Sequence, residues 1–184
     1  MSIDANFRVV KEEKKTYPPL PKNIYPVEIL AIDLVDAKGK YSKPGDKNFS
    51  FQFTVLAGKD KEENLRGRNL WDNFVPTTLF EGKKGKCSLW RIAEAVLGRE
   101  LTQQEMSEGF DGTFINSLIG KQIKVYNSHN LKNGTTYNLI TDYMSADVLQ
   151  PALSAEEKDK AAVKHKEQPK EEEEEEISVD SIPF

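Results

Sequence analysis

The chain has 184 residues but only one cysteine and two histidines. Cys87 alone excludes an intramolecular disulfide, and Cys87, His129 and His165 lie too far apart in sequence to indicate a zinc site. No apolar run approaches the roughly 20 residues that span a bilayer, and the first residues lack the basic-then-apolar pattern of a signal peptide. We therefore expect a cytoplasmic protein that holds no metal and no other cofactor.

Motifs of catalytic sites are also absent. The segment GKKGKCS at 82–88 has the glycines and lysines of a Walker phosphate loop but not their spacing. Cys87 has no histidine close in sequence to act as its base, and the spacing of Asp33, Asp72 and Asp142 does not indicate a metal-dependent nuclease. We expect no enzymatic activity.

The net charge of −4 hides a division between the body of the chain and its end. From Ser154 onward there are 5 basic and 11 acidic residues, a net charge of −6. The preceding residues carry 21 basic and 19 acidic groups, a net charge of +2. A mildly basic body thus carries a strongly acidic tail, and the whole-chain charge does not exclude a polyanionic ligand.

Composition divides the chain into four parts. Residues 1–22 end in the proline-rich YPPLPK and are expected to form an extended arm. Residues 23–150 contain the periodic apolar segments of a folded domain. Residues 151–176 turn to Ala, Lys and Glu, which bury too little apolar surface to fold, so we expect a flexible charged linker. Residues 177–184 form a separate tip, at the end of a disordered acidic tail.

Hydrophobic periodicity within 23–150 predicts three strands, a helix and two further strands. The strands are expected at 23–35, 48–56, 67–75, 121–127 and 135–144, and the helix at 88–98. Shorter helices are expected after TQQE at 102–105, a capping-box pattern, and near 114–119. Asn133-Gly134 indicates a turn, here in a connection longer than two residues. This order is typical of a mainly β fold, a five-stranded OB-type barrel with its helix, and a helical insertion, between strands three and four.

Alternation within the strands assigns their faces. In NFSFQFTVL the three phenylalanines share one face and are expected in the core. In GRNLWDNFV, Leu70 and Phe74 are expected to face one way and Asn69, Trp71 and Asn73 the other.

Single-stranded nucleic acid binds to basic grooves that also present aromatic rings to the bases. Trp71 lies on a polar strand face, Tyr126 shares a face with Lys124, and Tyr41 lies in the lysine-rich first loop. We expect these three rings to stack on bases. The expected phosphate contacts are Lys38, Lys40, Lys43, Lys47, Arg66, Arg68, Lys121 and Lys124. The alternatives are that Trp71 packs under the inserted helices, that Tyr126 is an ordinary strand residue, and that the loop lysines only aid solubility.

The last residues, DSIPF, follow six glutamates at Glu171–Glu176. This ending resembles the C-terminal tip of bacterial and phage single-stranded DNA-binding proteins, with the match at Asp180, Ile182, Pro183 and Phe184. The resemblance implies an OB domain, a flexible linker and a tip that recruits replication, recombination and repair proteins in a bacterial or phage-infected cytoplasm. A terminal carboxylate beside an aromatic ring is itself a compact recognition element.

The sequence therefore predicts a protein that binds single-stranded DNA with little sequence preference and recruits partners through its tail. We also expect the acidic tail to compete with DNA for the basic body. One rival is an OB-like adaptor that binds proteins and no nucleic acid, and a second is a metal-dependent nuclease. Oligomeric state, and a preference for DNA over RNA, are not readable from these residues.

Overall fold

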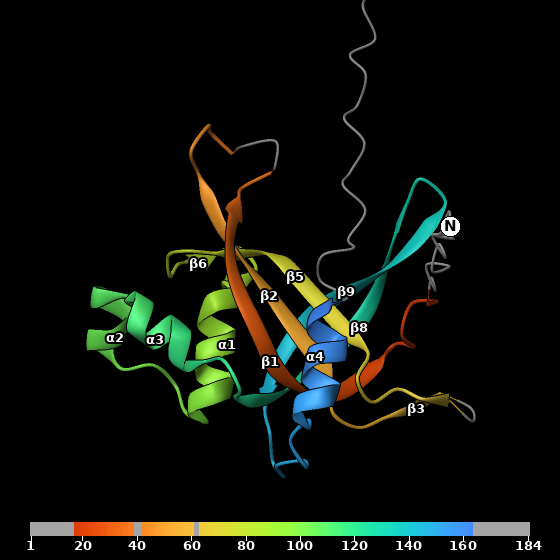
Figure 1. Cartoon of the computed structure of the whole chain (residues 1–184). Helices are drawn as coiled ribbons and strands as arrows, with labels where there is room; N and C mark the ends of the chain where they lie inside the picture. The colour runs from red at the N-terminus through yellow and green to blue at the C-terminus, as the bar shows by residue number, and fades with distance from the viewer. Residues whose placement is uncertain (1–16, 39–41, 61–62, 164–184) are drawn as a thin grey trace, which may run out of the picture.

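The computed structural model describes residues 17–38, 42–60 and 63–163, and its main feature is one five-stranded antiparallel sheet (Figure 1). Its strands are β1 (Asn23–Asp36), β2 (Lys47–Val55), β5 (Asn69–Pro76), β8 (Gln122–Lys132) and β9 (Thr135–Ser145). They lie in the order β5-β2-β1-β8-β9, and every neighbouring pair is antiparallel. The prediction of a mainly β fold is confirmed.

Helices interrupt the strands where the periodicity predicts them. Helix α1 (Ser88–Leu97) ends at Gly98, which adopts the left-handed conformation at φ 66°. Helices α2 (Gln103–Glu108) and α3 (Gly112–Ser117) follow. Thr102 and Glu105 form the expected capping box at the start of α2.

The core lies between the sheet and α1. Phe51 and Phe53 of β2 are fully buried, with ring centroids 5.9 Å apart, and they confirm the expected inward face of that strand. Leu89 and Ile92 of α1 pack into the same cluster. Each such side chain contributes about 1.5–3 kcal/mol on burial, so this cluster is the main source of the domain's stability.

The sheet is not closed into a barrel. Strands β5 and β9 are its two edges, and no backbone pairing joins them in the described part of the chain, so the expected barrel closure is wrong there. Side chains bridge this opening: the Tyr143 hydroxyl on β9 donates to the Asp72 carboxylate on β5. Helix α1 packs against β9, and its Arg91 donates to the Thr141 carbonyl at 2.9 Å. The two edges are therefore joined by polar side chains instead of a backbone ladder.

Tight hairpins complete the fold. Asn133 and Gly134 have φ values of 51° and 77° and connect β8 directly to β9. Two central residues with positive φ are typical of a type I′ turn, so the expectation of a longer connection is wrong. Two small hairpins pair β3 (Lys59–Asp60) with β4 (Glu63–Asn64), and β6 (Glu81–Gly82) with β7 (Gly85–Lys86).

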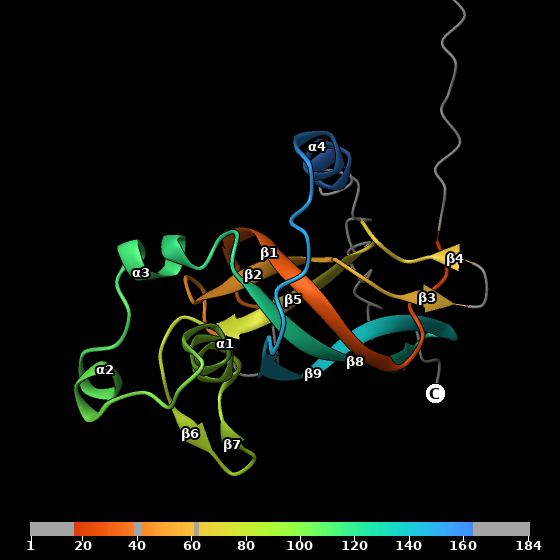
Figure 2. The ribbon, with the colours of Figure 1, turned by 90° about the horizontal axis from the view of Figure 1, so that it is seen from below.

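A fourth helix, α4 (Ala155–Val163), lies on the outside of the sheet. Figure 2 places α4 on one side of the strands and the β6–β7 hairpin on the other. None of the helices in the described residues is long and apolar enough to cross a membrane.

Candidate nucleic-acid interface

Helix α4 covers the outer, polar face of β1, β2 and β5. The carbonyl of Ala161 accepts hydrogen bonds from Gln52 on β2 at 3.3 Å and from Asn69 on β5 at 3.0 Å. Lys158 forms an ion pair at 2.6 Å with Glu28 on β1, whose side chain is buried. We call this surface the covered face. Its polar side chains are buried and are in contact with α4 of the same chain.

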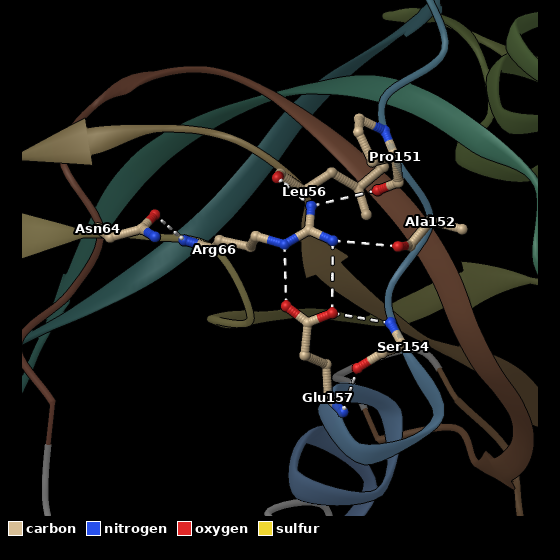
Figure 3. A network of polar contacts seen from close by, with 7 residues as sticks. All are labelled: Leu56, Asn64, Arg66, Pro151, Ala152, Ser154 and Glu157. Atoms are coloured by element: carbon tan, nitrogen blue, oxygen red, sulfur yellow. Dashed lines mark hydrogen bonds and ion pairs between the residues drawn. The ribbon is translucent and has the colours of Figure 1, made fainter.

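Arg66 joins the covered face to the segment that leads into α4 (Figure 3). Its Nε and Nη2 donate to the two carboxylate oxygens of Glu157 at 2.9 and 3.4 Å. Its remaining donors reach the carbonyls of Leu56 at 2.7 Å, Pro151 at 3.2 Å and Ala152 at 3.1 Å. All five guanidinium N–H groups thus have partners. In this arrangement Arg66 has no donor left for a phosphate.

A second capping box starts α4. The Ser154 hydroxyl accepts from the Glu157 amide at 3.2 Å, and the Glu157 carboxylate accepts from the Ser154 amide at 2.7 Å. Hydrogen bonds from Arg66 and from the Ser154 amide lower the pKa of Glu157 to about 2. The motif SAEE at 154–157 is the sequence signal for this helix start, and composition-based reasoning passed over it.

Trp71 lies on β5 at the border of the covered face. It pairs with Gln52 of β2, which itself contacts α4. The side chain is half-buried, and its indole N–H is buried without a hydrogen-bond partner in the described part of the chain. The ring is therefore only partly accessible to a base.

Tyr126 lies on β8, well away from Trp71. The two strands are three steps apart in the sheet, which separates them by roughly 14 Å. Tyr126 is 38% exposed and pairs with Ile24 of β1. Lys124, on the same strand, forms an ion pair with Asp147. The structure thus does not gather these predicted residues into one patch with Trp71.

The remaining predicted cations are also dispersed. Arg68 donates to the Pro18 carbonyl and lies over the ring of Tyr17 at 4.8 Å. Lys47 pairs with Asp36. Lys38 and Lys43 in the first loop and Lys121 before β8 are, like Lys47, exposed. Tyr41 and Lys40 lie outside the described residues, as do Asp180, Ile182, Pro183 and Phe184 of the tip.

A β-bulge in β5 changes the orientation that alternation assigned to Phe74. Phe49 pairs with Val75 and Phe51 pairs with Asp72, so two residues of β5 oppose Ser50 alone. Beyond such a bulge the two faces of a strand exchange. Phe74 is 67% exposed, and the expectation that it faces inward with Leu70 is wrong.

Phe74 lines an open groove of about 520 Å³ between the edges of β5 and β9. The other aromatic wall is Phe80, which precedes β6 and is 53% exposed. The β6–β7 hairpin supplies Lys83, Lys84 and Lys86, and Arg91 of α1 and Thr141 of β9 also line the groove. We call this surface the hairpin groove. Neither Phe74 nor Phe80 was among the predicted site residues.

Two of the three aspartates considered for a nuclease, Asp72 and Asp142, contact other side chains. Asp72 accepts a hydrogen bond from the Tyr143 hydroxyl. Burial, followed by the nearby Asp72 carboxylate, raises the pKa of Tyr143 well above its usual value. Asp142 pairs with Arg91 at 3.4 Å. Across residues 17–38, 42–60 and 63–163, no group of three or more His, Cys, Asp or Glu side chains is placed to hold a metal ion.

Comparison with known proteins adds no identity. Neither a protein-family model nor a curated protein matches this chain.

Proposed function

We propose that this chain binds single-stranded DNA with little sequence preference and recruits replication, recombination and repair proteins through its acidic tail. The observation that carries the proposal is the concentration of accessible rings and cations around one end of β5. Phe74 and Phe80 are exposed there beside the lysines of the β6–β7 hairpin. Rings and cations in one groove are what unpaired bases and their phosphates require.

The strand order supports an OB-type assignment. Strand β1 pairs with both β2 and β8, β5 pairs with β2, and α1 lies in the chain between the third and fourth main strands. This order supports an OB-type arrangement whose junction between the third and fifth strands is open. Because folds of this type host many functions, the assignment supports the proposal only together with the surface chemistry.

A titration of the full chain with labelled oligothymidine and with a duplex of equal length tests the proposal. We expect binding to the single strand to be at least tenfold tighter, and its affinity to fall steeply with salt because phosphate contacts release counterions. Equal or absent binding to the two DNAs would reject the proposal.

The tail is tested separately, by its removal. A chain that ends at residue 170 lacks the glutamates and the tip, and we expect it to bind oligothymidine more tightly at low salt because an internal anionic competitor is gone. It should also lose binding to tail-recognising partners. Unchanged affinity at low salt would remove self-competition from the proposal.

A second candidate is an adaptor that binds proteins and no nucleic acid. It is favoured by the covered face, where Arg66 and the polar strand residues already contact a helix of the same chain. Intact binding of the tip to partners without any oligonucleotide binding would select this function.

A further inference from the structure

We infer that the hairpin groove is the primary contact site for single-stranded DNA, with Phe74 and Phe80 stacked on bases and Lys83 and Lys84 bound to phosphates. The inference rests on the proposed function and locates it on a surface that the strand pattern did not indicate.

Two β-bulges build the groove. One places Phe74 outward on β5, as described above. The other lies on the opposite edge, where Tyr126 pairs with Asp142 and Asn127 with Ile140, so Thr141 is the extra residue of β9. Both bulged positions line the groove. Bulges are concentrated at sheet edges and beside functional sites because they redirect side chains, and here both redirect residues into the same space.

Four cations line the groove, and they fall into two pairs. Lys86 bonds Glu94 at 2.8 Å and Arg91 bonds the Thr141 carbonyl and Asp142, so these two hold the walls in place. Hydrogen bonds from Lys86, Trp90 and the Leu101 amide lower the pKa of Glu94 although burial, the largest single effect, opposes this. That carboxylate therefore stays charged and keeps its lysine.

Lys83 and Lys84 form the other pair and lie at the turn of the β6–β7 hairpin. Both side chains are exposed, and no ion pair holds either of them within the described residues. Helix α1 begins at the floor of the same groove, where Cys87 provides no side-chain cap for the first amides. The unneutralised charge of the groove is therefore positive and faces outward.

The chemistry of the groove selects an unpaired strand. Exposed rings stack on bases that are not already stacked in a duplex, and ammonium groups beside the rings suit the phosphate that accompanies each base. The β6–β7 hairpin, which lines the groove, lies on the side of the sheet away from α4 (Figure 2). A strand therefore reaches it without moving any described element.

The first test compares variants of the full chain for binding to fluorescent oligothymidine of about 12 nucleotides, a length within the usual site size. Phe74→Ala with Phe80→Ala should weaken binding about 30-fold or more. The matched control is Val148→Ala with Leu149→Ala, which removes two side chains of similar exposure, 71% and 72%, elsewhere on the surface. This control should bind as the parent does.

Charge is tested in the same assay. Lys83→Gln with Lys84→Gln should reduce the slope of log affinity against log salt by about 1.4, the contribution of two phosphate contacts to a single strand. Lys22→Gln with Lys59→Gln removes two exposed lysines elsewhere and should reduce it by less. Equal slopes for the two lysine variants would overturn the phosphate assignment.

Photocrosslinking of the parent chain to oligothymidine with 4-thiothymidine keeps the inference testable if the phenylalanine variant fails to fold. Adducts at Phe74, Phe80 or the β6–β7 hairpin support the inference. Adducts confined to Trp71 or Tyr126, or parent-like binding by the folded phenylalanine variant, would overturn it while the proposed function stands. A parent chain that binds no oligothymidine would instead reject the proposed function itself. If the two phenylalanines are required for binding a peptide of residues 171–184 but not for binding oligothymidine, the groove is a site for the tail and the inference is wrong.

Discussion

The covered face and the hairpin groove both border β5, but the first is buried and polar whereas the second is open and aromatic. The covered face is polar, and its Gln52, Asn69 and Glu28 are buried with partners supplied by α4. The hairpin groove is open and exposes Phe74 and Phe80 to solvent. Buried polar groups need hydrogen bonds, so a ligand on the covered face must replace those that α4 makes. A ligand in the hairpin groove meets no such requirement.

The largest expected effect comes from Arg66, whose contacts keep α4 on the covered face. Arg66→Ala leaves the carbonyls of Leu56, Pro151 and Ala152 without this donor and removes the pair with Glu157. We expect the docking of α4 to weaken by about 3 kcal/mol. Hydrogen exchange at the α4 amides should accelerate while the core strands remain protected.

Arg99→Ala is the matched control for that experiment. Arg99 also pairs with a capping-box glutamate, Glu105 at 2.7 Å, but on α2. This pair holds no part of α4, so exchange in α4 should not change. Unaltered α4 exchange in the Arg66 variant would show that the contacts in Figure 3 do not hold the helix.

The next largest effect concerns Trp71, at the border of the covered face. If α4 limits access to its ring, Trp71→Ala should reduce oligothymidine affinity about tenfold in the Arg66→Ala background, where a base can stack on it. In the parent background the same change should cost less than twofold. A cycle of the four proteins measures the coupling. Equal losses in both backgrounds would mean that α4 does not restrict the ring.

The sequence predicts the five main strands and α1 because each depends on the period of its own side chains. It does not predict the orientation of Phe74, because the bulge at Ser50 is a property of two paired strands. The docking of α4 was missed for a different reason. Composition measures how much apolar surface a segment can bury by itself, whereas α4 is held by an arginine about ninety residues earlier. Its start signal at Ser154 was visible, but its partner was not.

Acid should release α4 through Glu157 with a smaller effect than Arg66→Ala, because only the ion pair is lost. The pKa of this carboxyl falls from 4.5 to about 2 in the folded chain. A depressed pKa means that its contribution to docking is complete above about 4.5 and is lost as the pH falls towards 2. The protection of the α4 amides, taken as the exchange rate relative to the intrinsic rate at each pH, should follow that titration across this window. Glu157→Gln should flatten it, and an unchanged profile in that variant would assign the effect to other carboxylates.

The smallest effect is expected from the two capping boxes, which place the same chemistry at two distant sites. Ser154→Ala removes the cap of α4 and Thr102→Ala removes the cap of α2. Each change should destabilise its helix by about 1 kcal/mol. Only the Ser154 change acts on a helix that covers the sheet, so only it should speed α4 exchange, by about fivefold. Thr102→Ala should affect α2 alone. Because the lost hydrogen bond is equivalent in the two variants, a difference between them at the covered face reports the position of α4 and not the general stability of the domain. Equal α4 exchange in both variants would mean that the cap of α4 does not contribute to its docking.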